Sequence, residues 1–260
     1  MSRIAGKLAL VTGASSGIGQ SCARRLAADG VHLVLWARRK DRLDAVAAEI
    51  AKAHKVRVHT APVDVRERKA VERAAAAMVR AGRVPDILVN NAGLAAGLAK
   101  LHEGDPDDWD RMIDTNLKGL LYVSRAVIPH MVKAGRGHIV NIGSIAGHQV
   151  YPMGNVYNAS KFGVKALSEG MSVDLLGTPL RVSCVDPGHV RTEFASVRYH
   201  GDEARVESLY QGFRPLSPDD VAEVVAYVVN VPEHVTIADV IVFPTAQRSV
   251  HHIFRDEAAR

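Results

Sequence analysis

The sequence contains only two cysteines, Cys22 and Cys184, among 260 residues. Two isolated cysteines form neither a disulfide framework nor the paired spacing of a structural zinc site. We therefore expect a protein of the reducing cytoplasm. None of the twelve histidines belongs to an HExxH motif or to a His/Cys cluster with metal-ligand spacing. We expect no metal site.

Long hydrophobic runs are also missing, and aromatic residues make up only 5% of the chain. No stretch approaches the roughly 20 apolar residues that cross a bilayer. The apolar run near the N-terminus is too short for a secretion signal and leads directly into a glycine-rich turn. The net charge of +5 is not accompanied by basic clusters interleaved with aromatics. We therefore expect neither a membrane nor a nucleic-acid partner, and we interpret the charge as a basic surface around an anionic cofactor.

Short apolar runs rich in β-branched residues alternate with segments of helical period along the whole chain. Runs that are apolar at nearly every residue are typical of strands covered on both faces, and the alternation implies right-handed crossovers between parallel strands. The sequence thus predicts a single α/β domain over 1–260, with a Rossmann-type, doubly wound parallel sheet of about seven strands flanked by helices. The predicted strands are Leu8–Val11, Leu33–Ala37, Val56–Ala61, Ile87–Val89, His138–Ile142, Arg181–Val185 and Val240–Phe243, and the predicted helices cover about 17–29, 40–53, 66–81, 107–134, 156–176 and 218–230.

Residues 191–216 interrupt this alternation and contain Gly201, Gly212 and Pro215. Such a segment is either a surface excursion or a lid over the substrate. Because it directly follows a predicted strand, and ligands of open α/β sheets bind at the strand ends, we favour the lid.

A glycine-rich turn joins the first predicted strand to the first predicted helix. Its glycines allow the backbone to approach a pyrophosphate, and the helix N-terminus supplies N–H groups and partial positive charge. Taken alone, the turn could be only a tight strand-to-helix connection, but its position favours a dinucleotide site. The candidate cofactor residues here are Gly13, Ser15, Ser16, Gly17, Ile18 and Gly19.

The end of the second predicted strand reads Ala37-Arg38-Arg39, where sites that prefer NAD usually have an acidic residue. A guanidinium matches phosphate oxygens in a bidentate manner, so Arg38 and Arg39 predict a clamp for the 2′-phosphate of NADP(H). The alternative is that they form a solvated helix start together with Lys40 and Arg42. Further candidate cofactor residues follow the third and fourth predicted strands: Asp64 and Val65, then Asn91, Ala92 and Gly93.

Tyr157 and Lys161 are four residues apart and therefore share one face of a predicted helix. A nearby cation favours the phenolate and should lower the tyrosine pKa from its reference value of about 10. The pair is then a general acid/base, and the hydroxyl of Ser144 can hold a carbonyl or alcohol oxygen beside it. Asn116 lies inside a long predicted helix, where asparagine is unfavourable, which indicates a local bend or a bound water.

Together these residues resemble the short-chain dehydrogenase/reductase family over nearly the whole chain, to about Gln247. The resemblance implies that Tyr157 is the catalytic acid/base, that Lys161 binds the nicotinamide ribose and lowers the tyrosine pKa, and that Ser144 polarises the reacting oxygen. It implies that Asn116 holds a water in a proton relay. The family's turn beside the nicotinamide is matched by Pro187, Gly188 and Val190, followed by Thr192. The family also implies a homotetramer built on the helices at 107–134 and 156–176.

A narrower resemblance is to the NADP-dependent 3-hydroxy acid dehydrogenases, which act on serine, allo-threonine and related acids. It rests on Asn91–Ala95, Trp109 with Met112–Asn116, Asn155–Tyr157, Thr192–Phe194 with Val197, Arg198, Gly201 and Asp202, and Phe243–Gln247. Arg191 departs from the small residues usual in that group. The resemblance implies oxidation of a small 3-hydroxy acid, or the reverse reduction, with a 3-oxoacyl or other small-ketone reductase and a non-catalytic NADP(H)-binding regulator as alternatives.

A substrate carboxylate needs a cation in the pocket, because a buried unpaired charge is costly. Arg191, Arg198, Arg214 and His148 are the candidates. We favour Arg198, which lies within the stretch that resembles the 3-hydroxy acid group. The alternative is that Arg198 only ties the lid to Glu193 or Asp202.

Overall fold

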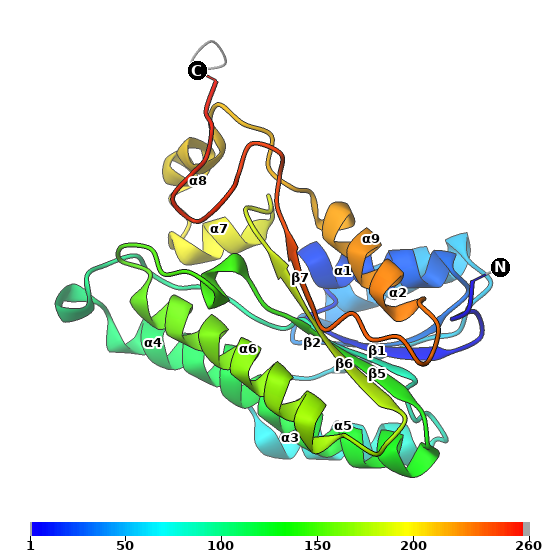
Figure 1. The fold of residues 1–260 in the computed structure, drawn as a ribbon. Coiled ribbons are helices and arrows are strands. Elements are labelled where there is room, and N and C mark those ends of the chain that lie inside the picture. The colour runs from blue at the N-terminus through cyan, green and yellow to red at the C-terminus, as the bar shows by residue number, and fades with distance from the viewer. Residues whose placement is uncertain (1, 257–260) are drawn as a thin grey trace.

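A seven-stranded parallel sheet forms the centre of the protein (Figure 1). The computed structural model describes residues 2–256. The strand order is β3-β2-β1-β4-β5-β6-β7, which confirms the predicted doubly wound sheet. The strands are β1 (Leu8–Thr12), β2 (His32–Ala37), β3 (Val58–Pro62), β4 (Ile87–Asn90), β5 (Gly137–Ile142), β6 (Leu180–Pro187) and β7 (Asp239–Val242).

Helices cover both faces of the sheet (Figure 1). Successive residues of a strand point to opposite faces, so in β1 Ala9 and Val11 contact one hydrophobic core while Leu10 contacts the other. The first core includes residues of α1 (Gly17–Ala28), α2 (Lys40–Ala53) and α9 (Pro218–Val229). The second includes residues of α3 (Arg68–Arg80) and α5 (Leu120–Ala134), and α4 (Pro106–Ile113) and α6 (Asn155–Asp174) pack together on the same side.

One predicted helix needs correction. The helix predicted over 107–134 is interrupted between α4 and α5 by a π-helical turn at Asp114–Gly119, which contains Asn116. The third strand ends at Pro62, so Asp64 and Val65 lie in the loop after it, before α3 begins. The segment 191–216 forms two short helices, α7 (Glu193–Arg198) and α8 (Glu203–Tyr210), which lie beside the C-terminal segment at one end of the sheet (Figure 1).

The strand order reverses direction between the neighbouring strands β1 and β4. After β1 the chain continues outward to β2 and β3, whereas β5, β6 and β7 extend the sheet on the other side. The loops that leave β1 and β4 therefore diverge, and this leaves a crevice at the carboxyl ends of the strands where ligands of such sheets bind.

Candidate active site

A cavity of about 640 Å³ lies at the carboxyl ends of the strands and collects most of the predicted site residues. Gly19 and Asn116 are the predicted site residues that do not line it. The predicted residues in its lining are Gly13, Ser15, Ser16, Gly17, Ile18, Arg38, Arg39, Asp64, Val65, Asn91, Ala92, Gly93, Ser144, Tyr157, Lys161, Pro187, Gly188, Val190, Thr192 and Arg198.

The glycine-rich turn forms one wall of the cavity. Gly13 has φ +65°, a conformation that glycine adopts without strain. A Cβ atom at Gly19 would lie 2.4 Å from Nδ2 of Asn91 and 2.5 Å from the carbonyl oxygen of Gly13. Gly19 therefore lets the first turn of α1 pack closely behind the loop, which explains why it supports the cavity without lining it.

Asn91 connects β4 to β1 across the crevice. Its backbone N–H donates to Oγ1 of Thr12 over 3.0 Å, and its side-chain amide donates to the carbonyl oxygen of Thr12 over 2.9 Å. These bonds hold the two diverging loops at a constant separation, so the width of the crevice is set by the protein itself.

Two of the arginines that follow β2, Arg38 and Arg39, line the cavity. Arg42 does not line it. Arg39 donates to Oγ of Ser16 over 2.8 Å and to Glu193 over 3.0 Å. Arg42 donates to the other carboxylate oxygen of Glu193 over 2.7 Å. Arg39 is thereby held next to the glycine-rich turn, and the 2′-phosphate clamp stays a prediction.

Tyr157 and Lys161 project from α6 into the cavity and both are buried. Nζ of Lys161 lies 6.0 Å from the centre of the Tyr157 ring and donates to the carbonyl oxygen of Ile142 over 2.9 Å. Burial lowers the pKa of Lys161 to about 8. Burial also raises the pKa of Tyr157, while a hydrogen bond with Ser144 and the charge of Arg198 act in the opposite direction.

The lowered tyrosine pKa that we expected from the sequence is therefore wrong for this structure. Desolvation of the phenolate outweighs the hydrogen bond with Ser144 and the charge of Arg198. The helical spacing predicted the proximity of Lys161 correctly, but spacing carries no information on how deeply the phenol is buried.

Asn116 lies beneath the cavity, in the π-helical turn. Its side chain exchanges two hydrogen bonds with the backbone of Leu94, at 2.9 and 2.8 Å, and donates to Oγ of Ser160 over 3.0 Å. A Cβ atom at Gly93 would meet Oδ1 of Asn116 at 3.2 Å and Nζ of Lys161 at 3.7 Å. The side chains of Asn116 and Lys161 therefore both approach the backbone of Gly93.

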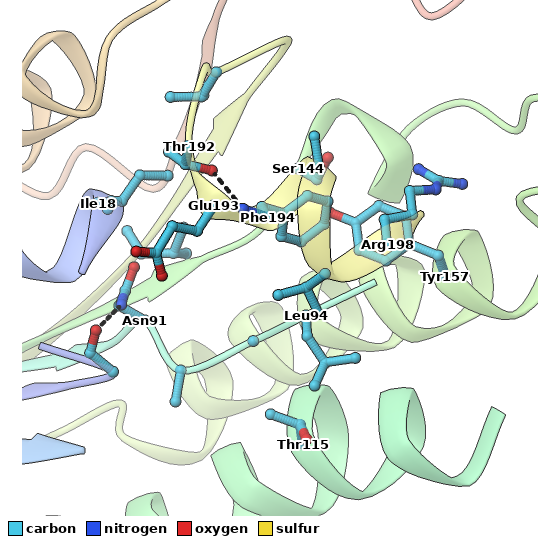
Figure 2. A pocket seen from close by; sticks show the side chains of 18 of the residues that line it. Ile18, Asn91, Leu94, Thr115, Ser144, Tyr157, Thr192, Glu193, Phe194 and Arg198 are labelled. Carbon is cyan, nitrogen blue, oxygen red and sulfur yellow. Dashed lines mark hydrogen bonds between the residues drawn. The ribbon is translucent and has the colours of Figure 1, made fainter. Parts of the chain in front are cut away.

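Residues of α7 form another part of the cavity lining. The ring of Phe194 meets that of Tyr157 edge to face, with centroids 5.6 Å apart. The guanidinium of Arg198 lies 5.6 Å from the centre of the Tyr157 ring and 5.2 Å from that of Tyr151 (Figure 2). Tyr151 and Phe194 line the cavity although the sequence analysis did not select them. Phe194 belongs to the stretch that resembles the 3-hydroxy acid group, whereas no motif or spacing marks Tyr151.

The structure separates the four candidate cations for a substrate carboxylate, all of which lie in its described part. Arg198 lines the cavity, whereas Arg191, Arg214 and His148 do not. Nε and Nη2 of Arg198 are buried and have no hydrogen-bond partner among the described residues. The two acids suggested as its partners are engaged elsewhere, Glu193 with Arg39 and Arg42, and Asp202 with the backbone of Arg205.

The segment 191–216 is also tied to residues outside the cavity lining. The N–H of Gly97 donates to the carbonyl oxygen of Arg198 over 3.0 Å, and Nε2 of His200 lies 3.0 Å from Asp108 on α4. Residues Thr192 to Ala195, Val197 to Tyr199, Leu209 and Tyr210 line the cavity. These contacts suit a lid over the site, which stays a prediction.

The comparisons with known proteins agree with this geometry. The family model described as short chain dehydrogenase matches residues 7–202. An NADP-dependent 3-hydroxy acid dehydrogenase of Salmonella typhi is 44% identical over 92% of this chain and 96% of its own, and the sulfoacetaldehyde reductase 2 of Chromohalobacter salexigens is 44% identical over 92% and 95%. The closed form of a serine dehydrogenase complexed with NADP+ superposes with a TM-score of 0.89 at 41% identity, covering 96% of this chain and 100% of that one.

Proposed function

Because this chain belongs to the short-chain dehydrogenase family, we propose that it interconverts a small 3-hydroxy acid and its carbonyl form with NADP(H). The observation that carries this proposal is the buried, unpartnered guanidinium of Arg198 beside the ring of Tyr157. It is a cation without an anion, next to a proton donor and inside a cavity that suits a dinucleotide.

The cavity fits NADP(H) at both of its ends. A Cβ atom at Gly13 would lie 2.8 Å from Nδ2 of Asn91. Only glycine, which has no side chain, therefore lets the turn pack against Asn91 and lets a pyrophosphate approach its backbone. Arg38 and Arg39 would hold the 2′-phosphate, and Lys161 would hold the nicotinamide ribose. The bound cofactor would supply or accept the hydride.

The remaining chemistry is assigned to the side chains of this chain. Ser144 and Tyr157 would hold the reacting oxygen between their hydroxyls. In reduction Tyr157 gives its proton to that oxygen, and in oxidation it accepts the proton. Lys161 stabilises the phenolate that remains after the proton leaves. Because burial makes a free phenolate costly, this contact matters most at the moment of transfer.

The two relatives named above support an anionic substrate of defined length. In a 3-oxo acid, one carbon separates the carboxylate from the carbonyl carbon, and in sulfoacetaldehyde one carbon separates the sulfonate from the aldehyde. Both substrates therefore place an anion at the same bond separation from the reacting carbon. We propose that Arg198 binds this anion, with the buried hydroxyl of Tyr151 beside it, because Arg198 is the charged group that acts on that hydroxyl.

We further propose that the protein acts in the cytoplasm as a homotetramer. Cys22 and Cys184 are both buried and unpaired, which suits a reducing compartment. Within the described residues, no helix combines the length and the apolar character needed to cross a membrane. Exposed apolar side chains on α5 and α6 support self-association: Leu121, Val132, Phe162 and Val173.

The test of the proposed function is a turnover assay with NADP and a panel of matched substrates. The panel contains serine, allo-threonine, 3-hydroxyisobutyrate and 3-hydroxypropionate, with sulfoacetaldehyde and 3-oxo acids in the presence of NADPH, and uncharged alcohols of similar size. We expect the anionic substrates to have the higher kcat/KM. Equal activity on the uncharged alcohols would contradict an anion site, and no turnover of any compound would favour a non-catalytic NADP(H)-binding regulator.

A further inference from the structure

A polar cluster lies behind Ser144, outside the lining of the cavity, and combines three elements that are distant in the sequence. Asp186 of β6 is fully buried, His148 follows the 3-10 turn Ile145–Gly147, and Lys165 lies on α6 one turn beyond Lys161. Asp239, at the start of β7, is the fourth member. None of these residues is used by the proposed chemistry.

Asp186 is joined directly to the backbone that carries Ser144. Its Oδ1 accepts the N–H of Ser144 over 2.8 Å. A Cβ atom at Gly143 would lie 1.9 Å from the same oxygen, so the carboxylate fits against the chain only because residue 143 is glycine. The position of Ser144 therefore depends on the position and charge of Asp186.

The second oxygen of Asp186 faces His148. Its Oδ2 lies 3.3 Å from Nε2 of His148, which also lies 3.8 Å from Oδ1 of Asp239. Both Oδ2 of Asp186 and Nε2 of His148 are buried, and neither has a hydrogen-bond partner of good geometry among the described residues. On the far side of the ring, Nζ of Lys165 lies 3.0 Å from Nδ1 of His148. Lysine has donors and no acceptor, so Nδ1 must accept and the ring proton must be on Nε2, where it faces Asp186.

We propose that His148 is a positioning residue for the reaction: Lys165 sets its tautomer, its Nε2–H holds the Asp186 carboxylate, and Asp186 holds Ser144 against the reacting oxygen. This inference rests on the proposed oxidoreductase activity. Three side chains of the cluster, His148, Asp186 and Asp239, offer ligand atoms within 4.8 Å of one another. A metal on Nε2 would require a proton on Nδ1, which would then face the ammonium of Lys165, so the geometry favours a proton over a metal ion.

The charges around Asp186 set the direction of a pH effect. Burial raises its pKa to about 6, assisted by Asp239, while the N–H of Ser144 and His148 favour the charged form. The thiol of Cys184 also approaches Oδ1, at 3.5 Å, and the charge of Asp186 acts on Tyr157 and Lys161. Activity should fall as the pH drops through the pKa of Asp186, and loss of His148 should move that fall to higher pH.

The experiment measures pH profiles of kcat and kcat/KM for the whole enzyme with NADP and its best substrate. We expect His148→Leu to lower kcat about tenfold near neutrality and to move the acid limb up by about one pH unit, because a buried carboxylate loses a donor. The KM for NADP should not change. His148→Gln should restore part of the loss, since its amide can donate to Asp186, and Lys165→Met should cause a smaller shift in the same direction.

His138→Gln is the matched control. His138 is buried at the other end of β5, where its Nε2 pairs with Ser183 over 2.7 Å, so its loss should lower the melting temperature without moving the acid limb. If the wild-type enzyme turns over substrate and His148→Leu has the same pH profiles, the inference is overturned and the proposed function still stands.

Two readouts do not depend on turnover. The ring nitrogen chemical shifts of His148 should report the Nε2–H tautomer in the wild type and lose that preference in Lys165→Met; an Nδ1–H tautomer would overturn the inference. Titration calorimetry with Zn²⁺ or Mn²⁺ should show no binding that His148→Leu and Asp239→Asn abolish. Such binding would instead make the cluster a metal site.

Discussion

Arg39 and Glu193 form an ion pair at 3.0 Å that joins the end of β2 to α7. Arg42 binds the other oxygen of the same carboxylate. The guanidinium predicted to bind the 2′-phosphate of NADP(H) is thus paired with an acid of the segment 191–216, the predicted lid. A phosphate that binds Arg39 has to compete with Glu193.

The first prediction concerns this competition. Glu193→Gln removes the competing charge and should lower the dissociation constant for NADP roughly two- to fivefold, a modest effect because the pair is half exposed. Binding of NAD, which has no 2′-phosphate, should not improve. Calorimetric titration with both cofactors checks this, and equal improvement for NAD would contradict the competition.

The second prediction concerns the clamp. Replacing Arg38 and Arg39 by alanine should raise the KM for NADP about tenfold or more and affect NAD little, because charge-assisted bonds to the phosphate are lost. Arg42→Ala is the control, since Arg42 binds Glu193 without lining the cavity. A wild-type enzyme that used NAD as well as NADP would exclude the clamp.

The third prediction concerns proton transfer. Tyr157→Phe keeps the ring against Phe194 and Arg198 but removes the transferable proton. We expect turnover to fall at least about a hundredfold, the usual contribution of a general acid/base, with NADPH affinity nearly unchanged in a fluorescence titration. Near-normal turnover would remove Tyr157 from the mechanism.

The fourth prediction concerns the substrate anion. Arg198→Met should lower kcat/KM for a 3-hydroxy acid at least about thirtyfold, because the carboxylate would be buried without its cation. An uncharged alcohol of similar size should lose little. Arg191→Met is a matched control in the same segment, where Arg191 pairs with Glu207 outside the cavity lining. Equal losses on both substrates would assign Arg198 to the structure of the lid.

The fifth prediction concerns assembly. We expect a tetrameric mass by light scattering at micromolar concentration. Phe162→Asp with Val173→Asp should dissociate it, because both side chains are exposed on α6, at 41% and 66%. Leu101→Asp, at a residue 59% exposed outside α5 and α6, should leave the mass unchanged. A monomeric wild type would exclude the tetramer.

The sequence by itself determined the local part of this protein. Strands and helices follow from hydrophobic periodicity, so the seven strands were predicted with shifts of a few residues at their ends. Two further features lie within single elements: the spacing of Tyr157 and Lys161 on α6, and Asn116 in the π-helical turn. Such features can be predicted because the regular backbone of a helix or strand fixes which residues a few positions apart share a face.

Only the tertiary structure decided which distant groups meet and how deeply they are buried. It placed Arg198 in the cavity lining and paired Arg191 with Glu207 outside it, and it placed Tyr151 and Phe194 in the cavity. It reversed the expected direction of the Tyr157 pKa, because desolvation depends on every element packed around the ring. The contact of His148 with Asp186 joins a turn to a strand 38 residues later, and no local pattern encodes such a pairing.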